Sequence, residues 1–117
     1  MVKQFDSLKE IQKYYDKETN TYVFEENGYY IDLVVFNFNL SIDANIEAFD
    51  IKAHDIIANN VYAHDINAWD INAKDISYFS VCFARGNIKC RSIKSNYPNA
   101  KHFVLNGELE VGEEENQ

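Results

Sequence analysis

The residues of this chain that could do chemistry are mostly aspartates, and they recur at a fixed interval. Along the middle of the chain an Asp follows every five residues, interrupted once by Asn60. The recurring residues are Asp50, Asp55, Asp65, Asp70 and Asp75. Rows of carboxylates can imitate nucleic-acid phosphates and attract a basic protein surface. Asp and Asn are also typical of turns, where they bind nearby backbone amides, so one array can serve both purposes.

Cysteine, histidine and glycine form no pattern typical of catalysis. Cys82 is expected to point outward and Cys90 inward, and no His-Asp constellation accompanies either thiol. His54 and His64 are interpreted as solvated side chains. The four glycines form no phosphate-binding loop. We therefore expect no enzyme activity, no catalytic residues, no metal and no cofactor.

Composition favours a folded, soluble protein with an acidic surface. Hydrophobic residues make up 46% of the 117 residues and aromatic residues 15%, which is too apolar for a disordered chain despite the net charge of -8. The longest strongly apolar run, residues 33–36, is far shorter than the roughly 20 residues of a membrane span. The polar start lacks the apolar segment of a signal peptide. Two cysteines outside a Cys-x-x-Cys pattern suggest reduced thiols, so we expect a cytoplasmic protein without membrane contact.

Charge is unevenly distributed along the chain. Residues 83–102 contain no acidic residue and predict a basic patch, formed by Arg85, Lys89, Arg91 and Lys94, with Lys101 nearby. The rest of the chain is acidic, and an acidic protein is repelled by free nucleic acid. Direct nucleic-acid binding is therefore disfavoured.

A period of five residues determines the predicted backbone. Ile or Val occupies every fifth position from 46 to 81, and Ala follows two residues later at 48, 53, 58, 63, 68 and 73. On a helix these positions would scatter around the axis, and in a straight strand successive Ile residues would alternate between faces. The pattern fits a chain that bends once per repeat, so that each Ile-x-Ala faces a common axis. This predicts an all-β fold, a β-solenoid, with Asp at its corners. Three or four sides remain open, as does handedness.

The ends of the chain predict caps on a single domain. A Ser7-x-x-Glu10 capping box begins a short helix to about residue 16, and a hairpin turns at Asn27-Gly28, so residues 1–33 form the N-terminal cap. The solenoid spans 34–95, beginning with a long strand, and Tyr78 and Phe83 replace inward Ala near its end. Residues 96–117 are expected to turn around Pro98 and form a C-terminal β-hairpin with an acidic tail.

Exposed aromatic residues are the second candidate for a binding site. Outward positions include Phe49, Trp69 and Phe79, which are typical anchors of protein interfaces or simple covers for their neighbours. If four repeats complete one coil, Phe49 and Trp69 lie on one side, with Phe79 above Asn59. On such a coil His54 and His64 lie on opposite faces and cannot share an ion.

The repeat resembles that of the pentapeptide-repeat proteins, over residues 44 to about 95. Their unit, A-(D/N)-L-x-x, winds into a right-handed quadrilateral β-helix, whereas the order here is Ile-x-Ala-x-Asp. The strings AHDINAWDINAKDI, SVCFARGNIKCRSIK and KHFVLNGELEV are similar to small uncharacterised proteins of Firmicutes and their phages. Some pentapeptide-repeat proteins imitate duplex DNA, so the resemblance implies a DNA mimic or an inhibitor of host defence.

These observations predict a non-catalytic, macromolecule-binding protein. The expected function is a phage or mobile-element inhibitor of a host enzyme that acts on DNA or RNA, such as a CRISPR effector (an anti-CRISPR) or a topoisomerase. The alternative is a structural β-solenoid scaffold that self-associates in the manner of a bactofilin. A homodimer is compatible with either function.

Overall fold

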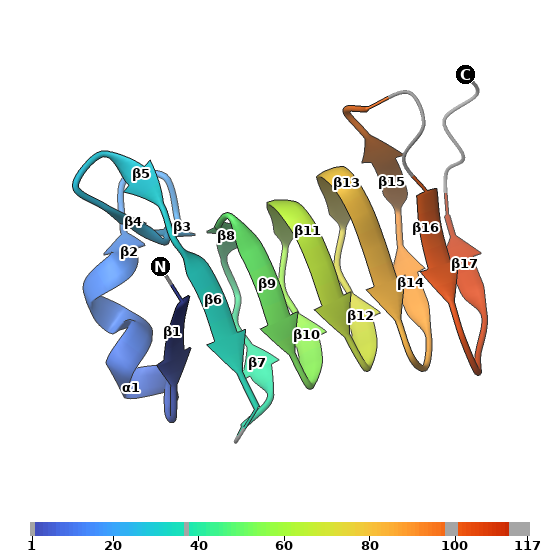
Figure 1. Ribbon diagram of the computed structural model, residues 1–117, viewed down its shortest axis with the longest axis horizontal. Coiled ribbons are helices and arrows are strands. Elements are labelled where there is room, and N and C mark those ends of the chain that lie inside the picture. The colour runs from blue at the N-terminus through green and yellow to red at the C-terminus, as the bar shows by residue number, and fades with distance from the viewer. Residues whose placement is uncertain (1, 37, 98–100, 113–117) are drawn as a thin grey trace.

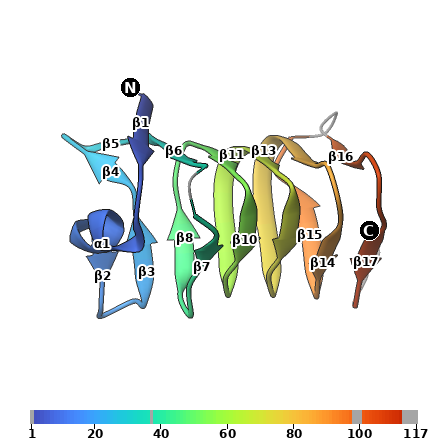
Figure 2. The same cartoon turned by 90° about the horizontal axis from the view of Figure 1, so that it is seen from below.

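The computed structural model describes residues 2–36, 38–97 and 101–112, and it is a β-solenoid (Figures 1 and 2). Strands in successive coils pair in parallel, with Val61 beside Ile46 and Ile66 beside Ile51. Each pair is 15 residues apart, which is three pentads. The coil therefore has three sides, and the quadrilateral coil implied by the pentapeptide-repeat resemblance is wrong for this chain.

Three parallel walls, called here sides 1, 2 and 3, enclose the interior. Side 1 contains β3 (Thr21–Val23), β8 (Asn45–Glu47), the first halves of β11 (Asn60–Ala68) and β13 (Asp75–Ala84), and β15 (Ser92–Ser95). Side 2 contains β1 (Val2–Phe5), β6 (Asp32–Val35), β9 (Asp50–Ala53), the second halves of β11 and β13, and β16 (Lys101–Val104). Side 3 contains β7 (Leu40–Ser41), β10 (Asp55–Ile57), β12 (Asp70–Asn72), β14 (Ile88–Cys90) and β17 (Leu109–Val111). We call the corner between sides 1 and 2 edge A, that between sides 2 and 3 edge B, and that between sides 3 and 1 edge C.

The repeated Ile and Ala residues face the interior as predicted. Ile51, Ile56 and Ile66 are fully buried, and the alternating Ala residues are at most 8% exposed. One large and one small side chain per side fill a narrow triangular interior. Each buried Ile contributes about 1.5–3 kcal/mol through the hydrophobic effect, before entropy is subtracted. The repeat is therefore the core of the protein.

One extra residue changes which side chains face inward after the sixth repeat. The pairing of β11 with β13 shifts between Ala63 and Asp65, so Ile66 pairs with Cys82 rather than with Val81. A one-residue shift exchanges the inward and outward positions of a strand. Cys82 and the following Ala84 are therefore fully buried. The predictions that Cys82 points outward and that Phe83 replaces an inward Ala are wrong.

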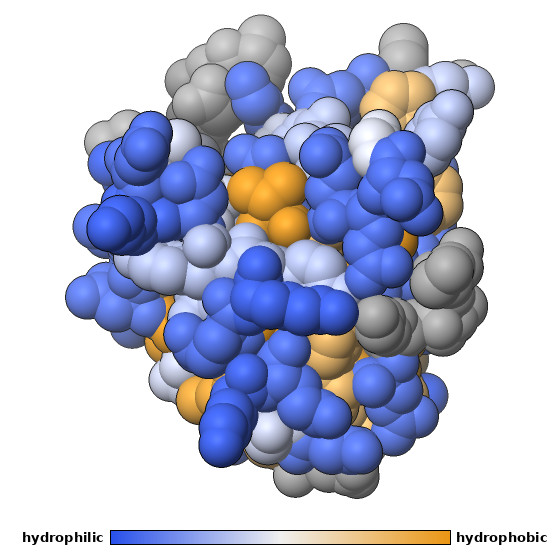
Figure 3. All heavy atoms as spheres, turned by 90° about the vertical axis from the view of Figure 1, so that its left-hand side faces the viewer, coloured by the Kyte–Doolittle hydropathy of each residue, from blue (hydrophilic) through white to orange (hydrophobic). Residues whose placement is uncertain are grey.

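The N-terminal end is capped, although by a shorter helix than predicted. Helix α1 (Leu8–Ile11) continues as the 3-10 helix η1 (Gln12–Tyr14) and then as strand β2 (Tyr15–Asp16), which pairs antiparallel with β3. Ser7 is the N-cap residue but makes no side-chain capping bond. In Figure 3, largely hydrophilic residues cover this end of the solenoid. No helix among the described residues is long and apolar enough to cross a membrane.

The predicted hairpin at Asn27-Gly28 is confirmed. Strands β4 (Glu25–Glu26) and β5 (Tyr29–Tyr30) pair antiparallel, and both turn residues have positive φ, 55° and 83°. Such torsions are what a type I′ turn requires. The long strand expected to follow is interrupted, because it bends into β6 on side 2 and β7 on side 3.

The predicted C-terminal hairpin is wrong. Strand β16 pairs in parallel with β13, and β17 pairs in parallel with β14, so both strands continue the coil on different sides. Asn106-Gly107 turns the chain around edge B instead of reversing it. The predicted turn at Pro98 and the tail at 113–117 lie outside the described residues.

Candidate partner-binding surface

The corner Asp and Asn side chains connect each coil to the next. The carboxylate or amide oxygen of one corner accepts a backbone N–H from the coil above it, 15 to 21 residues later in the chain. The acceptor and donor pairs are Asp32 and Asp50, Asn45 and Asn60, Asp65 and Val81, Asp70 and Asn87, and Asn87 and Glu108, with distances between 2.7 and 3.3 Å. Of the five predicted corner aspartates, Asp65 and Asp70 accept such bonds, and the amides belong to the neighbouring coil rather than to their own turns.

The five predicted aspartates do not form one array. Asp50 and Asp65 stack on edge A, whereas Asp55 and Asp70 stack on edge B. Asp75 lies on edge C, where Arg91 binds it at 3.1 Å and lowers the pKa of its carboxyl, with help from Ser92. Two rows of carboxylates therefore border side 2, and the fifth carboxylate is neutralised elsewhere.

A column of stacked rings runs along edge A. Residues 15 apart occupy the same corner of successive coils, so the imidazole of His64 lies between two phenyl rings. Its centroid is 4.9 Å from that of Phe49 and 5.0 Å from that of Phe79, and Tyr97 extends the column. The four-sided placement of Phe79 above Asn59 is wrong. Phe49 and Phe79 share one column, and Trp69 belongs to another.

Edge B carries the second column. The ring of Trp69 stacks on His54, with centroids 5.5 Å apart, and the Arg85 guanidinium lies 5.4 Å from the other side of the indole. Between the two columns, on side 2, a shallow hollow of about 430 Å³ is lined in part by Phe36, Trp69 and Lys52. Phe36 is 54% exposed, and Trp69 is 47% exposed.

The aromatic residues of side 2 and its two edges form the candidate surface, which we call the side 2 face. Its exposed members are Phe36, Phe49, Trp69, Phe79, Tyr97 and Phe103. Sequence reasoning identified three of these residues. Assuming 15 residues per coil would have predicted the edge A column, because Phe49, His64 and Phe79 are 15 residues apart in the sequence. Phe103 was missed because its strand was predicted in a hairpin.

The predicted basic patch is a ring. Arg85 lies on edge B, Lys89 on side 3, Arg91 on edge C and Lys94 on side 1. All four belong to the same level of the solenoid, but they point in different directions. The four basic side chains therefore do not form a patch on one face.

The two cysteines are free and buried. Burial raises the pKa of Cys82 to about 12 and that of Cys90 to about 11. A nucleophilic cysteine needs the opposite shift, toward the thiolate.

Comparison with known proteins finds no relative of this chain. No protein-family model, no curated protein and no solved structure matches the chain.

Proposed function

We propose that this protein is a non-catalytic binding protein that captures another protein on the side 2 face. The observation that supports the proposal is the gathering of exposed aromatic residues around one wall of a solenoid whose interior is filled. Phe36, Trp69 and Phe103 are each about half exposed on or beside this wall. Aromatic residues of this size are the usual anchors of protein interfaces, and contiguous exposed apolar surface marks interaction sites.

Four carboxylates border side 2, against the basic side chains of Lys52 and Arg85 that line its hollow, and this balance favours a basic partner. Asp50 and Asp65 border the face on edge A, and Asp55 and Asp70 border it on edge B. Successive coils are about 4.8 Å apart, so each edge presents a short row of negative charge. Such rows can occupy a cleft that normally holds phosphates. This supports the specific proposal of a phage or mobile-element inhibitor of an enzyme that acts on DNA or RNA, of the anti-CRISPR or DNA-mimic type.

Alanine substitution of aromatic residues tests the face. Trp69→Ala and Phe103→Ala should each abolish capture of a partner from lysate of a bacterial host, as measured by affinity pull-down with mass spectrometry. The matched controls are Tyr62→Ala on side 1 and Ile57→Ala on side 3, because these residues are 42% and 48% exposed. The proposal would be contradicted if the control variants also lost the partner, or if the Trp69→Ala and Phe103→Ala variants still captured it.

Charge removal tests the nucleic-acid-mimic version. The double change Asp55→Asn and Asp70→Asn removes the edge B charges but leaves oxygens at the corners. Binding of the captured enzyme should weaken, and the loss should shrink with added salt because salt already screens these charges in the unchanged protein. Asp75→Asn on edge C is the control. Unaltered binding by the double variant would leave a protein-binding function without mimicry.

A self-associating scaffold is the second candidate, supported by the C-terminal end. Among the described residues, strands β15, β16 and β17 pair on one edge only, and Leu105 and Leu109 beside them are 58% and 42% exposed. Open strand edges with apolar neighbours are sites of strand addition. Light scattering distinguishes the two functions. A discrete monomer or dimer favours the inhibitor, whereas open-ended polymers favour the scaffold.

A further inference from the structure

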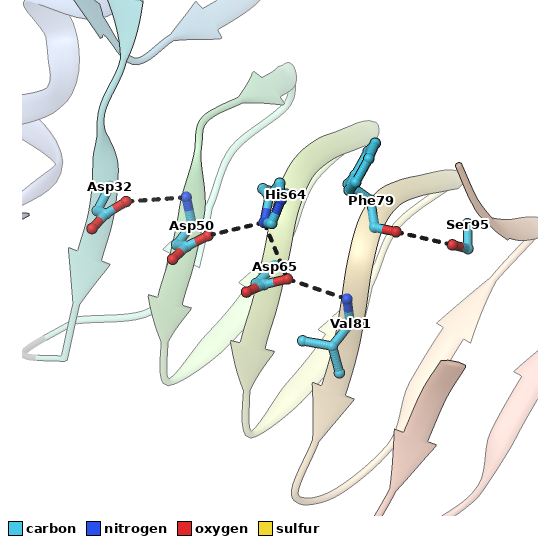
Figure 4. Close-up of polar contacts among 7 residues, drawn as sticks. All are labelled: Asp32, Asp50, His64, Asp65, Phe79, Val81 and Ser95. Carbon is cyan, nitrogen blue, oxygen red and sulfur yellow. Dashed lines mark hydrogen bonds and ion pairs between the residues drawn. The ribbon is translucent and has the colours of Figure 1, made fainter. Parts of the chain in front are cut away.

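Three side chains on edge A bring possible metal ligands together. Asp50 and Asp65 occupy the same corner of adjacent coils, and His64 precedes Asp65 (Figure 4). The His64 Nδ1 atom lies 3.3 Å from Asp65 Oδ1 and 3.8 Å from Asp50 Oδ1. The three atoms lie within 4.8 Å of one another. The cluster unites ligand atoms from two coils.

The surroundings hold these three side chains in place. The Phe49 and Phe79 rings lie nearly parallel to the imidazole, at 22° and 16°, so the ring plane of His64 is fixed. Asp65 accepts the backbone N–H of Val81 at 3.2 Å, which orients its carboxylate. Preorganised ligands of this kind lose little freedom when an ion binds.

Two atoms of the cluster make no hydrogen bond, although they lie at ion-pair distance from each other. Asp50 Oδ1 and His64 Nδ1 are both buried from solvent and make no hydrogen bond among the described residues. A buried polar atom without a hydrogen bond is destabilising relative to a satisfied one. A cation between the three ligands would satisfy both atoms and offset the repulsion among the carboxylates.

The ligand set selects the type of cation. One imidazole nitrogen and two carboxylate oxygens suit Zn²⁺ and its first-row neighbours better than Mg²⁺ or Ca²⁺, which prefer oxygen alone. Tetrahedral Zn²⁺ with bonds of roughly 2.0–2.1 Å holds its ligand atoms about 3.3–3.4 Å apart. The separations of 3.3 and 3.8 Å from Nδ1 are close to this value, and the ligand oxygens of Asp50 and Asp65 lie within 4.8 Å of each other.

We propose that Asp50, His64 and Asp65 bind a divalent transition-metal cation, with Zn²⁺ as the best fit. The side chains of His64 and Asp65 are 36% and 37% exposed, so an ion reaches the site from solvent and water completes its coordination. The ion would tie two coils together beneath the ring column of edge A. The site lies on the edge A border of the side 2 face, so a bound ion would offset the negative charge of Asp50 and Asp65 there.

Titration calorimetry with Zn²⁺ on the chelator-treated full chain tests the site. The unchanged protein should bind one equivalent, and His64→Phe should weaken binding at least tenfold. Phe is suited to this position because Phe already occupies the positions above and below it, so this variant keeps the column and the fold. His54→Phe is the matched control, since His54 also stacks on a ring and lies 3.4 Å from Asp55 but belongs to no group of three possible metal ligands among the described residues. Absence of binding to the unchanged protein, or equal binding by His64→Phe, would overturn the proposal.

Cobalt substitution identifies the ligand atoms. Co²⁺ bound at Asp50, His64 and Asp65 should give the visible spectrum of a nitrogen and oxygen site, and Asp50→Asn should alter it. A thiolate-to-cobalt charge-transfer band would place the ion on Cys82 or Cys90 and would also overturn the assignment.

Discussion

Replacing Asp70 tests whether the corner side chains stabilise the solenoid through hydrogen bonds or through charge. Asp70 Oδ1 accepts the backbone N–H of Asn87 from the next coil at 2.7 Å. A hydrogen bond to a charged group contributes about 1.5–3 kcal/mol to stability, and exposure reduces this value. We therefore expect Asp70→Ala to lower the free energy of unfolding by about 1–2 kcal/mol. For a domain of this size that corresponds to a fall of roughly 4–8 °C in melting temperature.

Asp70→Asn should behave differently. Asn already performs the same task at other corners, where Asn45 accepts the N–H of Asn60 and Asn87 accepts that of Glu108. An amide oxygen at position 70 therefore keeps the bond to the next coil while removing the charge. The expected loss is below about 0.5 kcal/mol, which is typical of a tolerated surface substitution.

Thermal and urea unfolding followed by circular dichroism provide the measurement. Asp55→Ala is the control, because Asp55 occupies the same edge one coil below and its recorded partner is His54 rather than a backbone amide. Its stability should change little. If Asp70→Asn destabilises as strongly as Asp70→Ala, charge matters more than the hydrogen bond. If Asp70→Ala has no effect, the corner bonds do not stabilise the coil and our reasoning fails.

Three further predictions follow from buried or crowded groups. Gly86→Ala should destabilise about as much as Asp70→Ala, because a Cβ at position 86 would lie 2.0 Å from Asp70 Oδ1, and the two changes should be less than additive in unfolding experiments. Burial lowers the pKa of His102 below its ordinary value of 6.5, so stability is lost as the pH falls from 6.5 toward the lowered pKa, and the protection factors of the β16 amides, which correct for the slower intrinsic exchange in acid, should fall over that range. Unchanged protection factors between pH 7 and pH 5 would count against this effect. Cys82, fully buried with its pKa raised to about 12, should react with a thiol reagent at pH 8 only after unfolding, and rapid labelling of the native protein would refute its placement.

The sequence predicted the solenoid because its signal is local and repeated. Each Ile-x-Ala-x-Asp unit excludes a helix and a straight strand by itself, and Asn27-Gly28 requires left-handed torsions that a hairpin turn uses. The number of sides depends instead on how sharply each corner bends, and five divides both 15 and 20. The interior volume decides the outcome, since only one large and one small residue per side must be enclosed.

The candidate sites depended on that undecided number. With four sides Asp50 and His64 are unrelated, whereas with three sides they meet on edge A. The position of the extra residue before Val81 could not be predicted either. It lies in the bend between Tyr78 and Val81, and the hydrophobic pattern of the sequence continues across it. Asn106-Gly107 misled the prediction because the same dipeptide closes a hairpin and turns a corner, and strand β1 was missed because its pairing partner lies 30 residues later.

In a coil of three pentads, the number of residues between two corner side chains determines whether they lie on the same edge. Inserting 15 residues would lengthen the solenoid by one coil, and each column of rings or carboxylates would stay on its own edge. Inserting a single pentad would keep Ile and Ala in the interior but would shift every later residue to the next side of the coil. Residues that now share one face would then lie on different faces. Insertions or deletions of three pentads thus change the length of the solenoid and keep its surface pattern. Insertions of one or two pentads change which residues share a face.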